Sequence, residues 1–252
     1  MSTTIKRFVK SAVRATGFEI RRRGEVRAHD RDIRHAEVFP AATYSPWLAD
    51  VEFDKVYQSI GNSTLVDVYR CYELWQLVAQ VAKLAGGDLI EIGVWRGGTG
   101  ALIGRQCQLA GIENSIYLCD TFRGVVKAGM QDKSYVGGEH ADTSQSTVVD
   151  LMRTLGIERA RILNGIFPDD TGHLVSDRTF RFCHIDVDVY DLAKDIMDWI
   201  WPRLVPGGIV VFDDYGFHNC VGITRFVNEE RARRDRLVVH NLNGHAIVIK
   251  TA

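Results

Sequence analysis

Four aspartates in the second half of the chain lie at or just beyond the ends of two apolar runs, residues 180–189 and 208–212. They are Asp186, Asp188, Asp213 and Asp214. Carboxylate oxygens are hard ligands that suit Mg²⁺ or Ca²⁺, and a carboxylate can also accept the proton of a hydroxyl group. Because the sequence has no Cys or His pair at the spacing of a zinc site, the residue types favour magnesium or calcium.

The two apolar runs have the composition of buried strands. Between them, Leu192, Ile196 and Trp199 recur at helical spacing. A strand, a helix and a strand of this length form a right-handed crossover with parallel strands, so both runs end at the same edge of the sheet. The aspartates are therefore predicted to meet at the carboxyl edge, where open α/β sheets bind ligands.

Carboxylates that meet in this way repel one another, and burying them unpaired would cost several kcal/mol. We therefore expect a cation among them. The competing interpretation is that individual aspartates cap the following helices or pair with lysines. Two acidic clusters across one crossover favour a metal-binding or catalytic role.

The composition is typical of a soluble globular protein, since 25% of the 252 residues are charged and 46% are hydrophobic. The length fits one large α/β domain with an added segment. The sequence has no apolar run of about 18 residues, so no membrane-spanning helix is predicted. The five cysteines form no CxxC pair, which fits a cytoplasmic protein in a reducing compartment.

Residues 1–40 are predicted to form a basic amphipathic helical extension, and residues 41–252 the main domain. Residues 1–35 carry ten Lys or Arg against four Asp or Glu, which leaves −7 for the rest of a chain of net charge −1. The extension could pack on the body or on a second subunit of a homo-oligomer, or rest on the inner face of an anionic membrane as a peripheral contact. It has no secretory cleavage site, and basic residues do not recur with aromatics elsewhere, so neither export nor nucleic-acid binding is predicted.

A glycine-rich turn follows the first predicted strand of the main domain, residues 88–94. Glycines at this place let the backbone approach a ligand closely, and the start of the following helix favours anionic groups. The turn reads E-x-G-x-x-x-G-G and does not match the G-x-G-x-x-G dinucleotide pattern. Glu91 would oppose a pyrophosphate but would suit a ligand with an ammonium or sulfonium charge.

The second predicted strand, residues 115–119, leads to Asp120. A carboxylate at this place can accept both hydroxyls of a nucleoside ribose. Residues 122–142 are polar, include four glycines and have no sustained periodicity, so they are predicted to form a lid. A helix at 143–155, capped by Asp142 or Thr143, and a strand at 160–163 follow.

The order of four motifs resembles the macrocin O-methyltransferase family. The motifs are E-x-G-V-W-x-G-G at 91–98, D-x-F-x-G at 120–124, H-I-D-V-D-x-Y at 184–190 and P-G-G-x-x-x-x-D-D-Y-G at 206–216. The resemblance extends over about residues 44–249 and includes T-L-V-x-x-x-R-x-Y-x-L at 64–74. It implies a class I methyltransferase, with a Rossmann-like seven-stranded mostly parallel sheet, helices on both faces and an antiparallel last strand.

The resemblance also implies a function, namely S-adenosylmethionine-dependent and magnesium-dependent methylation of a sugar hydroxyl. The implied contacts to the cofactor come from Glu91, Gly93, Trp95, Gly97, Asp120, Thr121, Gly165, Ile166 and Asp186. Of these, Glu91 and Gly93 would face the methionine part, Asp120 the ribose, and Gly165 and Ile166 the adenine. The implied metal ligands are Asp186, Asp213 and Asp214. Asp186 or Asp188 would take the hydroxyl proton.

The residue types agree with this chemistry, because a divalent cation that binds a vicinal diol lowers the hydroxyl pKa and fixes its position. His184 is predicted to turn to the same sheet face as Asp186, either as a residue that orients the catalytic groups or as a hydrogen-bonded core histidine. Three alternatives remain open at this stage. They are a catechol-type or other small-molecule acceptor, a nicotinamide oxidoreductase, and a methyltransferase-like binding protein without catalysis.

Overall fold

The computed structural model describes residues 16, 25–26, 32–38 and 42–251 of the chain. The amphipathic helix predicted near the amino end lies outside these residues. In the described part of the first 40 residues, two short strands, β1 (Glu25–Val26) and β2 (His35–Ala36), pair in antiparallel fashion. None of the helices in the described ranges has the length and apolar character that a membrane crossing requires.

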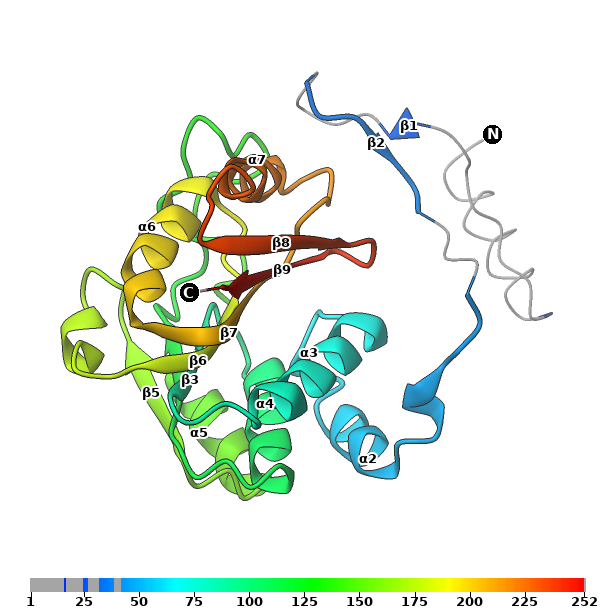
Figure 1. Ribbon diagram of the computed structural model, residues 1–252, viewed down its shortest axis with the longest axis vertical. Coiled ribbons are helices and arrows are strands. Elements are labelled where there is room, and N and C mark those ends of the chain that lie inside the picture. The colour runs from blue at the N-terminus through cyan, green and yellow to red at the C-terminus, as the bar shows by residue number, and fades with distance from the viewer. Residues whose placement is uncertain (1–15, 17–24, 27–31, 39–41, 252) are drawn as a thin grey trace.

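Seven strands form one sheet in the order β5-β4-β3-β6-β7-β9-β8 (Figure 1). They are β3 (Asp88–Ile92), β4 (Ile116–Asp120), β5 (Ala160–Asn164), β6 (Phe180–Ile185), β7 (Leu204–Phe212), β8 (Arg236–Asn241) and β9 (His245–Lys250). The pairings from β5 across to β7 are parallel, and β9 is antiparallel to both of its neighbours. The predicted seven-stranded, mostly parallel sheet with an antiparallel last strand is therefore confirmed.

Helices cover both faces of this sheet, as predicted (Figure 1). One apolar cluster contains side chains of α6 (Tyr190–Ile200) and α7 (Val221–Glu230), and the other contains side chains of α2 (Val51–Ser59), α3 (Val68–Val81), α4 (Gly98–Leu109) and α5 (Gln145–Thr154). Three short 3-10 helices, η1 (Pro46–Leu48), η2 (Gly172–Val175) and η3 (Trp201–Arg203), complete the described elements. Adjacent residues of β3 divide between the clusters, with Ile90 in the first and Leu89 in the second. The core thus lies in two layers that hold the strand ends in place.

The predicted crossover is β6, α6 and β7, but β6 is shorter than predicted. It ends at Ile185 rather than at residue 189. Asp188 has a φ of 63°, a left-handed conformation that does not continue a strand. As a result, Asp186 and Asp188 both belong to the loop between β6 and α6 rather than to the strand itself.

The predicted cap of α5 was wrong. The helix begins at Gln145, and the side chain of Ser144 accepts the hydrogen bond from the backbone N–H of Thr147. Asp142 does not cap the helix because its carboxylate binds Trp95 and Arg96 instead. The tertiary contact therefore overrides the local capping preference.

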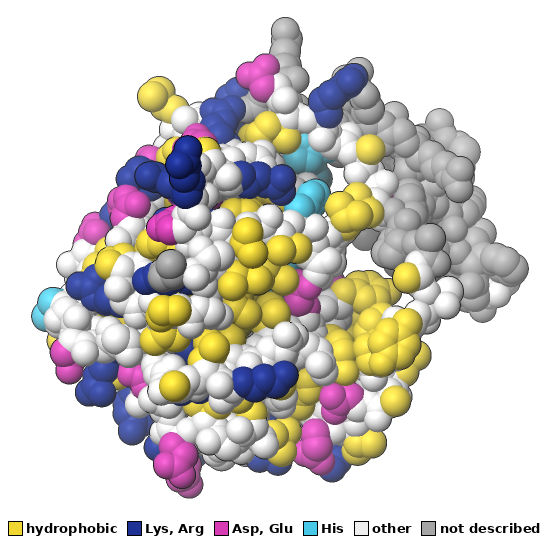
Figure 2. All heavy atoms as spheres, viewed as in Figure 1, with side chains coloured by type: hydrophobic (Ala, Val, Ile, Leu, Met, Phe, Trp, Pro, Cys, Tyr) yellow, Lys and Arg dark blue, Asp and Glu magenta, His cyan; other side chains and the backbone are white. Residues whose placement is uncertain are grey.

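The visible surface in Figure 2 has Lys and Arg side chains interspersed with Asp and Glu, together with hydrophobic groups. Exposed apolar side chains near η1 and α2 include Leu48 and Val51.

Candidate functional site

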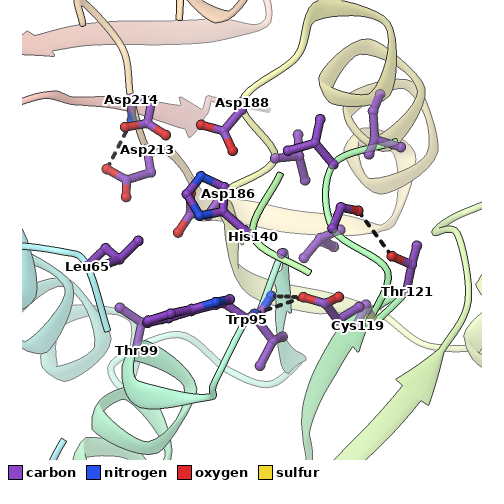
Figure 3. Close-up of a pocket in the computed structure, with 18 of the residues that line it drawn as sticks. Leu65, Trp95, Thr99, Cys119, Thr121, His140, Asp186, Asp188, Asp213 and Asp214 are labelled. Carbon is purple, nitrogen blue, oxygen red and sulfur yellow. Dashed lines mark hydrogen bonds between the residues drawn. The ribbon is translucent and has the colours of Figure 1, made fainter. Parts of the chain in front are cut away.

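A cavity of about 320 Å³ lies at the carboxyl edge of the sheet, next to the ends of β3, β4, β6 and β7 (Figure 3). Most of the predicted site residues line it, namely Gly93, Trp95, Asp120, Thr121, Gly165, Ile166, Asp186, Asp188, Asp213 and Asp214. Three predicted residues, Glu91, Gly97 and His184, lie away from its wall. Parallel pairing therefore brings residues from distant parts of the sequence into one cavity, as the crossover argument predicted.

Gly93 lets the end of β3 pack tightly against the loop after β6. Its φ is +88°, and a Cβ atom at this position would lie 1.6 Å from the backbone oxygen of Asp186. No side chain fits there unless the backbone moves. Gly97 acts differently, because it is the N-cap of α4 with a φ of +87° and an added Cβ would lie 3.0 Å from Val148 of α5. Gly93 thus positions the Asp186 loop, whereas Gly97 shapes the start of a helix.

Asp120 holds the glycine-rich turn from the end of β4. Its Oδ2 accepts hydrogen bonds of 2.8 Å from the backbone N–H groups of Val94 and Trp95. Its Oδ1 accepts a third hydrogen bond, of 2.6 Å, from the N–H of Phe122. A carboxylate has about four acceptor sites, so one remains for a ligand hydroxyl. Asp120 therefore fixes the turn and still lines the cavity.

Residues 122–142 form an irregular segment with no helix or strand of its own. The hydroxyl of Thr121 starts the segment by donating to the carbonyl of Gly124 over 3.2 Å (Figure 3). Farther along, the hydroxyl of Tyr135 donates to Asp188 Oδ1 over 2.6 Å. Burial, together with the Asp188 carboxylate, raises the pKa of Tyr135 well above its ordinary value, so this hydroxyl keeps its proton. The segment predicted as a lid thus contacts a predicted catalytic residue directly.

Trp95 of the glycine-rich turn contacts Asp142 at the end of the same segment. Its indole N–H donates to Asp142 Oδ1 over 2.9 Å, and Arg96 binds Asp142 Oδ2 over 2.6 Å. The guanidinium of Arg96 also lies 4.4 Å from the centre of the Trp95 ring. These contacts connect the glycine-rich turn to the segment that follows Asp120.

The wall that was predicted to hold an adenine is largely apolar. Ile166 and Phe167 line the cavity together with Leu192 of α6. The backbone N–H of Ile166 donates to Asp170 Oδ2 over 2.8 Å, which fixes the turn after β5. Such a wall suits the flat face of a base.

Three carboxylates converge at the cavity (Figure 3). Asp186, Asp213 and Asp214 each offer an oxygen within 4.8 Å of the oxygens of the other two, a separation that allows one ion to bind all three. Arg70 of α3 reaches into this cluster, with its Nη1 atom 2.5 Å from Asp213 Oδ1 and 3.6 Å from Asp214 Oδ1. A cation was predicted among the aspartates, and Arg70 supplies one positive charge for three negative ones.

The pKa shifts differ among the three carboxyl groups of the cluster. Burial and the neighbouring carboxylates raise the pKa of Asp186 and of Asp214 well above the ordinary value. Burial acts in the same direction on Asp213, but His245 and Arg70 outweigh it and lower the pKa of that carboxyl. Arg70 therefore does not offset the burial and repulsion of Asp186 and Asp214, and their oxygens are the ligand type that Mg²⁺ prefers.

His184 and Glu91 form a buried pair away from the cavity wall. They lie opposite each other on the neighbouring strands β6 and β3, and His184 Nδ1 is 2.9 Å from Glu91 Oε1. Both side chains are fully buried. Glu91 therefore contacts a histidine and does not line the cavity, and His184 does not line it either.

Three residues around the aspartates had no predicted role, namely Arg70, Tyr135 and His245. Arg70 lies in the motif T-L-V-x-x-x-R-x-Y-x-L, and the single arginine of this motif could have been singled out as a site residue from the sequence. Tyr135 and His245 reach the site from a loop and from the last strand. No local pattern marks either of them.

Comparison with known proteins supports the sequence resemblance. A family model described as Macrocin-O-methyltransferase (TylF) matches residues 54–242. The chain is 29% identical over 168 residues to an 8-demethyl-8-(2,3-dimethoxy-alpha-L-rhamnosyl)-tetracenomycin-C 4'-O-methyltransferase of Streptomyces olivaceus, covering 62% of this chain and 64% of that enzyme. It therefore spans less than two thirds of that relative's length. A demethyldecarbamoylnovobiocin O-methyltransferase of Streptomyces niveus is 27% identical over 185 residues, covering 68% of this chain and 69% of the relative.

The fold is also shared with a solved structure, that of the O-methyltransferase NovP. The two superpose with a TM-score of 0.67 at 24% sequence identity, covering 75% of this chain and 83% of NovP. The class I methyltransferase fold predicted from the sequence is therefore confirmed.

Proposed function

The chain belongs to the macrocin-O-methyltransferase family, and we propose that it transfers a methyl group from S-adenosylmethionine to a hydroxyl of a sugar with the help of Mg²⁺. The observation that carries this proposal is the convergence of Asp186, Asp213 and Asp214 on the cavity that the glycine-rich turn also lines. The relatives are named as methyltransferases of glycosylated or antibiotic compounds. An acceptor with two adjacent hydroxyls is the substrate class that this arrangement fits best.

S-adenosylmethionine would bind between the glycine-rich turn and the apolar wall. Asp120 retains one acceptor site for a ribose hydroxyl, and Ile166 and Phe167 offer an apolar surface for the adenine. The sulfonium charge would lie in a cavity whose nearest charged groups are mainly carboxylates, which favours a cationic ligand. The cofactor carries the reactive methyl group, and the protein aligns it.

The carboxylate cluster fits a magnesium ion by ligand type and by charge. Asp186, Asp213 and Asp214 would hold the ion. Burial and mutual repulsion raise the pKa of Asp186 and Asp214, and a bound cation would offset both effects. A bound magnesium ion supplies Lewis-acid activation of the acceptor hydroxyl and a template for a vicinal diol. Arg70 fixes Asp213 from α3 and limits the repulsion within the cluster.

Asp188 is the residue that we assign as the proton acceptor. It lines the cavity but lies outside the group of three carboxylates that would hold the ion. Tyr135 donates to its Oδ1, which orients the carboxylate, and Asp188 would accept the proton of the acceptor hydroxyl. Asp186 was the other predicted candidate, and its place in the metal cluster makes it the less suitable base.

The test is methyl transfer from S-adenosylmethionine to a panel of sugar and catechol acceptors, with Mg²⁺ or with a chelator. The Asp186→Asn variant should lose magnesium-stimulated transfer and keep its affinity for S-adenosylhomocysteine within a few fold. Asp198→Asn is the matched control, because Asp198 is exposed on α6 and its ion pair among the described residues is with Lys194. Full activity of wild-type protein in chelator would remove magnesium from the proposal, and preference for catechols would replace the sugar acceptor.

A further inference from the structure

Two buried histidines flank Asp213 on neighbouring strands. Asp213 follows β7, which lies between β6 with His184 and β9 with His245. The register pairs Phe212 of β7 with Ala246 of β9, so His245 is the next residue toward Asp213. Both histidine side chains are 0% exposed, and their ring centres are 6.0 Å apart. Neither histidine lines the cavity, whereas Asp213 does.

Each histidine uses its Nδ1 atom to bind a glutamate. His184 Nδ1 lies 2.9 Å from Glu91 Oε1, and His245 Nδ1 lies 2.6 Å from Glu73 Oε2. An ionised carboxylate only accepts hydrogen bonds, so Nδ1 carries the proton in each ring. The Nε2 atom of a neutral ring is then a lone pair that needs a donor or a cation. In both histidines, Nδ1 therefore contacts a glutamate and Nε2 carries the lone pair.

Neither Nε2 atom has a hydrogen-bond partner among the described residues. His245 Nε2 lies 3.2 Å from Asp213 Oδ1, close enough for an ion pair but without hydrogen-bond geometry. One ring nitrogen of each histidine and a carboxylate oxygen of Asp213 lie within 4.8 Å of one another. Two buried ring nitrogens without a donor therefore lie near the Asp213 carboxylate, whose Oδ1 accepts from Arg70 and from the backbone N–H of Asp214.

We propose that His184, His245 and Asp213 form an inner site for one divalent transition-metal ion, separate from the magnesium site of the proposed function. Imidazole nitrogens with one carboxylate suit zinc, cobalt, nickel or iron(II) better than Mg²⁺, which prefers oxygen ligands. Glu91 and Glu73 occupy the positions of the carboxylates that commonly orient metal-binding histidines through their second nitrogen. Asp213 belongs to both ligand groups and would connect the inner ion with the cavity.

The alternative occupant is a proton on His245. A protonated Nε2 would face Asp213, which is the state in which His245 lowers the pKa of that carboxyl, and it would satisfy the His245 ring. It would leave His184 Nε2 buried without a partner among the described residues. An ion between the three side chains satisfies both nitrogens.

The test uses Co²⁺ as the probe on chelator-treated, full-length protein in an excess of Mg²⁺, which occupies the oxygen site. We expect one Co²⁺ per chain, with a visible absorption band, and an anomalous diffraction peak between His184, His245 and Asp213. The Asp186→Asn variant, which alters only the magnesium site, should retain the band. His245→Asn should lose it, and the exposed His173→Asn should keep it as the matched control. Glu73→Gln should weaken Co²⁺ binding about 10- to 100-fold.

Absence of bound Co²⁺ in the wild type overturns the proposal, as does a band that survives in His245→Asn. A diffraction map with a hydrogen-bonded His245–Asp213 pair and no ion assigns the site to a proton instead. If His245→Asn does not fold, the anomalous peak in wild-type crystals decides the question alone. Methyltransferase activity enters none of these measurements, so failure of the proposed function and failure of the inner site are distinguishable.

Discussion

Replacing Arg70 by methionine removes the one described positive charge that contacts the carboxylate cluster while keeping most of the side-chain volume. The ion pair with Asp213 is buried, since the two side chains are 8% and 2% exposed. Removing one partner of a buried ion pair costs about 3–5 kcal/mol, because the other charge stays buried without compensation. For a chain of this size, such a loss lowers the melting temperature by about 6–20 °C.

Magnesium should reverse part of this loss. Without Arg70 the cluster is more negative, so a divalent cation should bind more strongly and stabilise the variant more than it stabilises the wild type. The assay is thermal unfolding of Arg70→Met and wild type, each in chelator and in excess Mg²⁺. Arg153→Met is the control, because its ion pair with Asp150 is exposed and worth at most about 1 kcal/mol. An Arg70→Met protein that melts within 2–3 °C of the wild type (about 1 kcal/mol), or equal protection of both proteins by Mg²⁺, would refute the electrostatic reasoning.

Three further outcomes are expected. Asp120→Asn should weaken binding of S-adenosylhomocysteine at least about tenfold, since the turn loses a charged acceptor for two N–H groups. Calorimetry measures this affinity, and an unchanged value would remove Asp120 from the cofactor site. Tyr135→Phe should lower kcat by up to about 100-fold with cofactor affinity unchanged, because Asp188 loses the 2.6 Å hydrogen bond from the Tyr135 hydroxyl. An unaltered kcat would argue against Asp188 as the base. Gly93→Ala should unfold at a clearly lower temperature than the wild type, because a Cβ lies 1.6 Å from the Asp186 oxygen; a wild-type melting curve would show that the loop can move.

The sequence predicts the crossover and the meeting of its aspartates because both follow from local patterns and general rules of chain connection. Apolar runs around Asp186 and Asp213 indicate buried strands, and parallel pairing then brings the strand ends together. The glycine-rich turn and Asp120 are predicted for the same reason. These features need only the order of the elements.

The contacts that reach in from other elements could not be predicted in this way. His245 is brought beside Asp213 by the antiparallel insertion of β9 beside β7, which no local spacing reveals. Tyr135 comes from an irregular segment without periodicity. Glu91 looked like a ligand contact from its position in the turn motif, but its direction depends on the register between β3 and β6.

The most direct measurement is a crystal structure of the protein with S-adenosylhomocysteine and Mg²⁺. The expected map shows an ion about 2.1 Å from oxygens of Asp186, Asp213 and Asp214, with the cofactor product against Gly93 and Ile166. A map with the cofactor product in the cavity and the three carboxylates held by Arg70 alone, at saturating Mg²⁺, would contradict the metal-assisted mechanism.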